Sequence, residues 1–314
     1  METDRQYDGR VVKSFGKRYI VQTTDGTFDC DLRGRFRLTT EDTITPIAVG
    51  DRVSIRVENP PYGVIEELHE RRNKLSRPEV IKPFREQILV ANCDQLIIVA
   101  SVTKPRLKLG AIDRFLMGAE NNGMDGVVVV NKCDLGHEKT KDRALEIYRA
   151  AGYKAVATSA ETGEGIDELR SIVQLKTSMF CGHSGVGKSS LINALQPGLK
   201  VETGEVSEAT GKGTHTTTTI ELHPLDFGGY IVDSPGIRVI GIWKLSKEDL
   251  PELYPEFRTR MDQCRFRNCM HIGEPNCAVV AAVQAGEIAQ ERYDGYLRIR
   301  ESLEFRAANP DFFQ

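Results

Sequence analysis

Short segments of alternating apolar and polar residues occupy the first part of the chain. GRVVKSF, RYIVQT, GTFDCDL and DRVSIRVE are separated by Gly, Asp and Pro turn signals. Alternation with a period of two predicts strands with one buried face. Several short strands in succession predict a small β-barrel over residues 1–72, and the five-stranded oligonucleotide-binding (OB) barrel fits this length.

The pattern changes after the polar stretch RRNKLSRPEV. Buried-strand runs LIIVAS, VVVVN, KAVATS and TSMFCG alternate with segments of helix length, and TTIELH and GGYIVDS follow. Such alternation predicts parallel strands joined by crossover helices, and therefore an α/β domain over residues 73–243. Residues 244–314 read as mostly helical and are expected to form a third domain.

Length, charge and hydropathy narrow the class of protein. A chain of 314 residues agrees with several domains, and a formal net charge of -3 excludes a globally basic nucleic-acid binder. No run is long and apolar enough to span a bilayer, and the N-terminus has no signal-peptide core, which predicts a soluble cytoplasmic protein.

Basic residues of the predicted barrel have two possible roles: they form a local nucleic-acid-binding face, or they are ordinary solvated surface. These residues are Lys13, Lys17, Arg18, Arg33, Arg35 and Arg37.

A glycine-rich segment follows the apolar run TSMFC and precedes the helix-forming run SLINAL. It comprises Gly182, His183, Ser184, Gly185, Val186, Gly187, Lys188, Ser189 and Ser190. Strand, glycine-rich loop and helix in this order predict a phosphate-binding loop. Backbone N–H groups would surround the phosphates, Lys188 would reach the β and γ phosphates, and Ser189 would ligate Mg²⁺.

A second motif decides between adenine and guanine. NKCD follows the strand VVVV and comprises Asn131, Lys132, Cys133 and Asp134. The Asp134 carboxylate can accept hydrogen bonds from guanine N1–H and the exocyclic amine, a pattern that adenine does not offer, so an ATPase is disfavoured. Lys132 is expected to lie along the base and Asn131 to brace the loop. Thr158, Ser159 and Ala160 end the next strand, where the Ala160 N–H is expected to meet guanine O6.

Two further segments are candidates for sensing the γ-phosphate. DSPG follows GGYIV, and its Asp233 and Gly236 are expected to support Mg²⁺ through water and to contact the γ-phosphate. Upstream lies GKGTHTTTT, in which Thr216 or Thr217 is the candidate Mg²⁺ ligand. A threonine-rich surface strand is the alternative for this segment.

The catalytic residue is the least conventional part of the site. Ile237 follows DSPG, where many GTPases place a glutamine that orients the attacking water. His215 in GTHTTT is therefore the candidate catalytic residue, with a surface histidine as the alternative. Slow intrinsic turnover that a partner accelerates is expected.

The motifs also stand in a permuted order. In ordinary GTPases the guanine-reading motifs come last, whereas here NKCD and TSA precede GHSGVGKS. Joining chain termini that lie close together costs little stability, so the same sheet can form from a permuted chain. The order predicts a circularly permuted P-loop GTPase domain whose second switch runs almost directly into the C-terminal segment.

Seven cysteines divide into a cluster and four scattered residues. The spacing Cys-x₄-Cys-x-His-x₅-Cys supplies the four potential ligands Cys264, Cys269, His271 and Cys277. This set matches a closed, structural zinc site, with unligated reduced cysteines as the alternative. Cys30, Cys93, Cys133 and Cys181 are expected to be small buried hydrophobes. Nearby arginines would contact RNA phosphates or simply solubilise the segment, and these are Arg258, Arg260, Arg265 and Arg267.

With permuted NKCD, TSA, GHSGVGKS, GTHTTT and DSPG, a barrel before them and the Cys/His cluster after them, the chain resembles the RsgA (YjeQ/YloQ) family of bacterial ribosome small subunit-dependent GTPases. The resemblance covers nearly the whole length. It implies an OB barrel, a permuted GTPase domain and a zinc domain that act in late maturation of the small ribosomal subunit, with GTP, Mg²⁺, zinc and ribosomal RNA as ligands. A monomer is expected. The alternative is a GTP-dependent switch on another structured RNA, in which hydrolysis is incidental.

Overall fold

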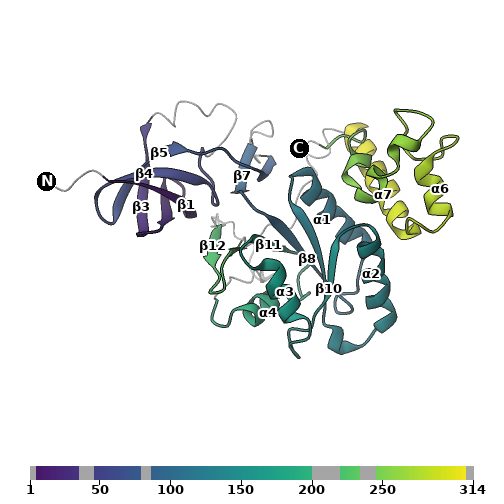
Figure 1. Cartoon of the computed structure of the whole chain (residues 1–314), viewed down its shortest axis with the longest axis horizontal. Coiled ribbons are helices and arrows are strands. Elements are labelled where there is room, and N and C mark those ends of the chain that lie inside the picture. The colour runs from purple at the N-terminus through teal and green to yellow at the C-terminus, as the bar shows by residue number, and fades with distance from the viewer. Residues whose placement is uncertain (1–4, 35–45, 79–85, 200–219, 234–244, 309–314) are drawn as a thin grey trace, which may run out of the picture. The chain divides into compact units, whose positions relative to one another are not determined.

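A computed structural model describes residues 5–34, 46–78, 86–199, 220–233 and 245–308 (Figure 1). The chain forms two compact units, each assembled from separate stretches of sequence. The first unit contains residues 1–94, 173–179 and 198–237, and the second contains residues 95–172, 180–197 and 238–314. The three-domain division at residues 72 and 243 remains a prediction from the sequence.

Five strands of the first unit form a closed barrel. They are β1 (Arg5–Phe15), β2 (Arg18–Thr23), β3 (Gly26–Leu32), β4 (Arg52–Asn59) and β5 (Tyr62–Leu68). Antiparallel pairs β1–β2, β2–β3, β4–β5 and β1–β4 and the parallel pair β3–β5 close the ring. Alternate apolar side chains such as Val11, Val21 and Ile55 fill its core. The predicted OB-type barrel is confirmed.

Several basic residues of the barrel already have carboxylate partners. Lys13 pairs with Glu221 at 2.5 Å, and Arg18 pairs with Asp29 at 2.9 Å. Arg33 pairs with Glu66 at 3.1 Å. Arg35 and Arg37 lie outside the described residues. These ion pairs favour an ordinary solvated surface for three of the six candidate RNA contacts.

The rest of the first unit consists of short strands. β6 (Lys74–Pro78) and β7 (Glu86–Ala91) form a two-stranded sheet, in a stretch where the sequence pattern indicates only a polar connection. Burial of Leu75 explains this strand. β12 (Glu221–Pro224) pairs antiparallel with β13 (Tyr230–Asp233), and β13 pairs in parallel with the first residues of β11 (Thr177–Cys181).

The second unit contains parallel strands, as the α/β pattern predicts. β9 (Asp125–Asn131) lies between β8 (Gln95–Ser101) and β10 (Lys154–Ala157). Their apolar residues are almost continuous, because both faces of a parallel sheet are covered. The helices of this part are α1 (Leu109–Asn121), the 3-10 turn η2 (Cys133–Leu135), α2 (Glu138–Ala150), α3 (Ile166–Val173) and α4 (Lys188–Leu195).

The C-terminal part of the second unit is helical, as predicted. Its elements are η3 (Leu250–Leu253), α5 (Pro255–Arg258), η4 (Met261–Gln263), α6 (Ala278–Gln284) and α7 (Gln290–Ala308). α7 packs against α1, so the C-terminal helices share a core with the α/β part (Figure 1). Among the described residues, no helix is long and apolar enough to cross a membrane.

Candidate nucleotide and metal sites

The two guanine motifs and the glycine-rich loop come together at one edge of the second unit. β8 and β9 end in register at Ser101 and Asn131, and β10 ends one step away, with Ala157 opposite Val130. Because the carboxyl ends of parallel strands meet at the same edge of a sheet, the residues that follow them become neighbours. The NKCD motif, the TSA motif and the glycine-rich loop, which are far apart in the sequence, therefore lie together at this edge.

Asn131 links the NKCD motif to the glycine-rich loop and to the TSA motif. Its side-chain amide donates to the carbonyl of Val186 at 2.9 Å and accepts from the Thr158 hydroxyl at 3.1 Å. Asn131 and Thr158 are buried, so neither hydrogen bond competes with bulk water. A Cβ atom on Gly187 would lie only 2.4 Å from the Asn131 amide nitrogen, so this close approach requires glycine.

Lys132 makes a second bridge between the guanine motif and the phosphate loop. Its Nζ donates to the carbonyl of Gly185 and to the carbonyl of Lys104, both at 2.6 Å. The backbone of Lys132 is left-handed, with φ of 65°, which turns the side chain towards these acceptors. The Nζ of Lys132 thus fastens the guanine motif to the glycine-rich loop.

Asp134 and Ser159 form the candidate guanine-reading pair. The buried Ser159 hydroxyl donates to one Asp134 carboxylate oxygen at 2.5 Å, while Asp134 itself is exposed. This hydrogen bond orients the exposed carboxylate. Ala160 is half-buried beside them.

Lys188 begins α4 directly after the loop. Its Nζ donates to the carbonyls of Gly182 and His183 at 2.9 and 3.0 Å. Burial lowers the pKa of this ammonium group, so a bound anion would stabilise its charged form. Ser189 and Ser190 follow in the first turn of α4.

The remaining predicted nucleotide contacts are Asp233 and residues that the structure does not describe. Asp233 ends β13 in the first unit, is buried, and lies 3.8 Å from Nε2 of His223. Gly236 and the switch candidates His215, Thr216 and Thr217 lie outside the described residues. Their roles stay predictions.

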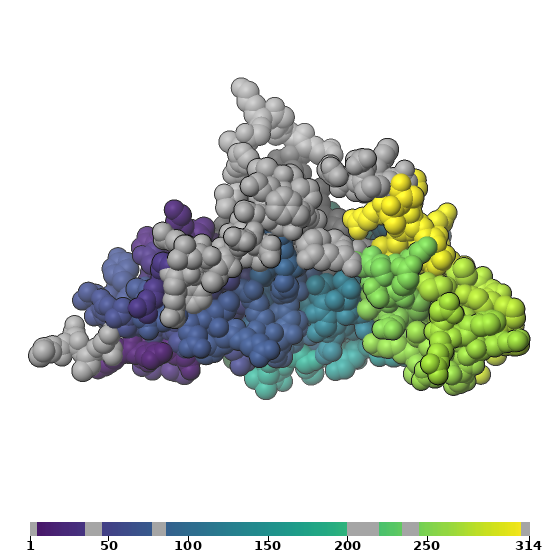
Figure 2. Space-filling view, turned by 90° about the horizontal axis from the view of Figure 1, so that it is seen from above, coloured from purple at the N-terminus to yellow at the C-terminus, as the bar shows by residue number. Residues whose placement is uncertain are grey.

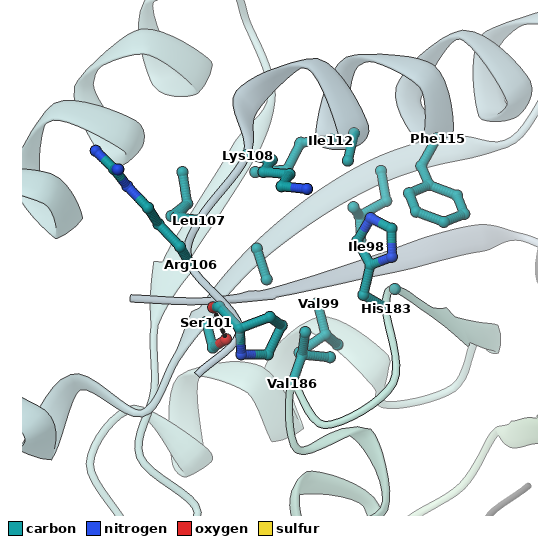
Figure 3. Close-up of a pocket in the computed structure, with 14 residues that line it drawn as sticks. Ile98, Val99, Ser101, Arg106, Leu107, Lys108, Ile112, Phe115, His183 and Val186 are labelled. Carbon is teal, nitrogen blue, oxygen red and sulfur yellow. Dashed lines mark hydrogen bonds between the residues drawn. The ribbon is translucent and has the colours of Figure 1, made fainter. Parts of the chain in front are cut away.

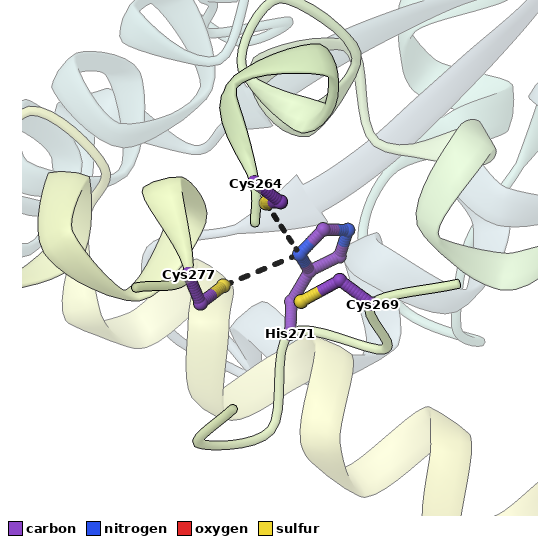
Figure 4. A group of neighbouring side chains, drawn as sticks. All are labelled: Cys264, Cys269, His271 and Cys277. Atoms are coloured by element: carbon purple, nitrogen blue, oxygen red, sulfur yellow. Dashed lines mark hydrogen bonds between the residues drawn. The ribbon is translucent and has the colours of Figure 1, made fainter. Parts of the chain in front are cut away.

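The four candidate metal ligands do converge (Figure 4). All four ligand atoms lie within 4.8 Å of one another. Nδ1 of His271 lies 3.3 Å from Sγ of Cys277 and 3.6 Å from Sγ of Cys264. A tetrahedral zinc with ordinary bond lengths separates such ligands by roughly 3.6 Å, so the donor set fits this ion.

Neighbouring side chains hold the loop that carries these ligands. The Glu274 carboxylate accepts from the backbone N–H groups of Met270 and Ile272 at 2.7 and 2.8 Å. From α7, the Tyr296 hydroxyl donates to the Met270 carbonyl, and the Tyr293 hydroxyl donates to the His271 carbonyl. Burial lowers the pKa of His271, which favours the neutral imidazole that a metal requires.

The structure shows the burial of the scattered cysteines and the ion-pair partners of the C-terminal arginines. Cys30, Cys93, Cys133 and Cys181 are buried, as predicted, and no disulfide joins them among the described residues. Arg258 pairs with Glu120, and Arg260 pairs with Glu287. Arg265 and Arg267 are exposed, and the Arg265 guanidinium lies over the exposed Phe266 ring. Among the described residues, Arg265 and Arg267 form no ion pair, and both alternatives stay open for them.

Comparison with known families identifies the class of this site. The model of the RsgA GTPase family matches residues 68–243, which is more than half of the chain. The chain belongs to the RsgA GTPase family. The RsgA N-terminal domain model matches residues 8–65, which contain most of the barrel. The expected circularly permuted GTPase domain is thereby confirmed, and the enzyme is a GTPase.

Relatives match over nearly their full length. A small ribosomal subunit biogenesis GTPase RsgA from Caldanaerobacter subterraneus subsp. tengcongensis is 42% identical over 291 residues, covering 93% of this chain and 94% of the relative. The RsgA of the same description from Moorella thermoacetica is also 42% identical, over 92% and 95% of the two chains.

Two solved structures share the fold. YjeQ from Thermotoga maritima matches with a TM-score of 0.81 at 39% identity, covering 95% of this chain and 99% of its own. YloQ, described as a circularly permuted GTPase, matches with a TM-score of 0.75 at 31% identity over 96% of each chain.

One feature of the nucleotide site, and one buried charge cluster outside it, could not be identified by motif reasoning. The connection between β8 and α1 supplies the Lys104 carbonyl to Lys132, although no local signal marks it as part of a nucleotide site. Arg292 on α7 is buried with Asp113 and Glu256, and these three charges are far apart in the sequence. Both depend on tertiary neighbours.

Proposed function

We propose that this RsgA GTPase hydrolyses GTP to GDP and phosphate in the cytoplasm, is stimulated by the small ribosomal subunit, and acts as a monomer in late maturation of that subunit through its ribosomal RNA. The observation that carries the guanine-specific part is the Asp134 carboxylate, oriented by the Ser159 hydroxyl, in a motif whose Asn131 and Lys132 are hydrogen-bonded to the glycine-rich loop. Relatives described as small ribosomal subunit biogenesis GTPases support the choice of partner.

The chain's own residues divide the work of binding GTP. Asp134, oriented by Ser159, accepts the guanine N–H groups, and Ala160 donates to guanine O6. Lys188 and the backbone N–H groups of residues 182–187 hold the phosphates. The fixed bridges between these parts set the distance between base and phosphates before the nucleotide arrives, which reduces the entropy cost of binding.

Magnesium and zinc have separate roles in this proposal. The Ser189 hydroxyl, at the junction of loop and helix, and Thr217 would offer oxygen ligands of the kind Mg²⁺ prefers. The bound Mg²⁺ would neutralise charge on the β and γ phosphates. One zinc ion would be held by the Cys₃His cluster, where four protein ligands leave no position for a substrate.

Replacement of Asp134 by Asn is expected to weaken GTP binding about 10- to 100-fold. The variant loses a charged hydrogen-bond acceptor, a loss of about 1.5–3 kcal/mol, and its amide points a donor at the guanine amine. The amide can instead donate to the 2-oxygen of xanthine, so affinity for xanthosine triphosphate should rise. Titration with fluorescent GTP and xanthosine triphosphate analogues measures both effects.

Asp142→Asn provides a matched control, because Asp142 is an exposed aspartate on α2. It should bind both nucleotides as the unmodified protein does. Unaltered GTP affinity in the Asp134→Asn variant would remove Asp134 from the guanine site.

Replacement of His215 by Ala is expected to lower the subunit-stimulated rate of hydrolysis by about 10²- to 10⁴-fold, the usual contribution of a group that handles the proton or water. The affinity for a non-hydrolysable GTP analogue should change little. Single-turnover hydrolysis with and without small ribosomal subunits measures the effect. His137→Ala, an exposed histidine after the NKCD motif, serves as a control. Full stimulation of the His215→Ala protein would eliminate this role.

The choice of ribosomal partner is tested by co-sedimentation with small ribosomal subunits in GTP, GDP and a non-hydrolysable analogue. The analogue should strengthen subunit binding relative to GDP, and the subunits should raise turnover. If neither occurs, a GTP-dependent switch on another structured RNA replaces the ribosomal proposal.

A further inference from the structure

The connection between β8 and α1, residues 102–108, is fastened to the nucleotide site by its backbone. The Nζ of Lys132 donates both to the carbonyl of Lys104 and to the carbonyl of Gly185. In addition, the Ser101 hydroxyl donates to the Pro105 carbonyl at 2.8 Å. Pro105 also faces Gly185, since a Cβ atom there would lie 3.8 Å from the proline ring. A force on this connection therefore reaches the phosphate loop through two contacts.

The same connection carries an isolated group of positive charges. Lys104, Arg106 and Lys108 are all exposed, and none forms an ion pair in the described part of the chain. The sequence contains no acidic residue between Asp94 and Asp113. Some exposed cations of this unit have carboxylate partners instead, for example Arg143 with Glu291 and Arg258 with Glu120.

The direction of Arg106 argues against a contact with the nucleotide itself. Arg106 and Lys108 border a small pocket between β8, α1 and the phosphate loop, lined on its apolar side by Ile98, Phe115 and Val186. Figure 3 shows the Arg106 side chain extending away from His183 and Val186, and Arg106 is exposed. The charge is thus presented outward, where an external polyanion can reach it.

We propose that Lys104, Arg106 and Lys108 form an RNA backbone contact of the GTPase, which reports bound ribosomal RNA to the phosphate loop through Lys132. Unpaired cations are the residues that neutralise RNA phosphates and release counterions. An RNA held against this connection would restrain the Lys104 carbonyl and, through the shared Nζ, the carbonyl of Gly185. This inference rests on the proposed ribosomal function, and it explains how bound ribosomal RNA would act on the phosphate loop.

The test compares two double variants with equal loss of charge. Arg106→Gln with Lys108→Gln removes two cations of the proposed contact. Lys154→Gln with Arg298→Gln removes one lysine and one arginine that are exposed and have no ion pair among the described residues. Binding to small subunits and to protein-free small-subunit RNA is measured over a salt series, together with stimulated turnover and GDP affinity of the free protein.

The proposed contact predicts about tenfold weaker RNA binding for the Arg106/Lys108 variant and a salt slope smaller by about two, with a parallel loss of stimulated turnover. The control pair should match the unmodified protein. Equal RNA binding by the two variants overturns the inference, as does a loss confined to intact subunits, which would indicate a ribosomal protein partner. A loss of GDP affinity in the free protein would place the cations at the nucleotide instead. If the unmodified protein fails to bind or respond to subunits, the proposed function itself fails.

Discussion

Removal of zinc is expected to open the segment from η4 to α6 while α7 keeps its place. Between Met261 and Cys277 the structure contains only a 3-10 turn and loops, so the ligands provide most of its order. Binding free energy of a structural zinc is folding free energy, with apparent values of about 10–16 kcal/mol in small zinc-dependent peptides. Hydrogen exchange before and after chelation should show lost amide protection in this segment. Metal analysis should give one zinc per chain.

The cysteine variants separate metal loss from general destabilisation. Burial raises the pKa of the Cys269 thiol to about 12, so the metal-free cluster holds protonated thiols that cannot replace the lost bonds. Cys269→Ser should therefore reproduce chelation, whereas Cys30→Ala, at a buried cysteine in the barrel, should retain zinc. Properly folded protein with no zinc would refute the assignment.

Replacement of Arg292 by Met is expected to release α7 from α1 at a cost of about 3–5 kcal/mol, because it leaves two buried carboxylates without their cation. The guanidinium donates to Asp113 at 2.6 Å and to Glu256 at 2.7 Å and lies 4.5 Å from the centre of the Tyr254 ring. Burial alone would lower the pKa of Arg292, but Asp113 and Glu256 more than offset it, so the group stays charged. Hydrogen exchange of α7 amides measures the opening.

A second variant shows whether charge compensation or packing is responsible. Replacing all three partners together, Arg292→Met, Asp113→Leu and Glu256→Leu, should recover much of the protection, since buried ion clusters exchanged for apolar groups are often neutral in stability. Arg298→Gln, exposed on the same helix, should change it by less than about 0.5 kcal/mol. Unchanged protection in the single variant would mean that α7 is held by other contacts.

The structure also shows why α7 can approach α1 so closely at this cluster. A Cβ atom on Gly295 would lie 2.3 Å from an Asp113 carboxylate oxygen. Glycine in the middle of a helix of 19 residues normally costs stability, and here it makes room for the buried carboxylate. The C-terminal helices are thereby fixed to a helix of the guanine-binding unit.

Much of this molecule follows from local pattern. Alternating residues predicted the barrel strands, near-continuous apolar runs predicted β8 to β11, and the spacing of Cys264 to Cys277 predicted a ligand set that does converge. Such features can be recognised because strand periodicity, phosphate-loop geometry and ligand spacing are imposed by a few consecutive residues. β6 was missed because its burial comes from tertiary packing, while its own sequence looks polar.

By itself, then, the sequence determined the fold class, the permuted order of the motifs and the chemical type of each candidate residue, since these depend on short-range chemistry. Only the tertiary structure decided which partners those residues have. Asn131 and Lys132 reach the phosphate loop because parallel strands end at one edge, and Lys104 enters the site because its backbone lies beside that edge. Arg292 is compensated only where α1, α5 and α7 meet. Long-range pairing of this kind is fixed by packing and burial, which no local stretch of residues encodes.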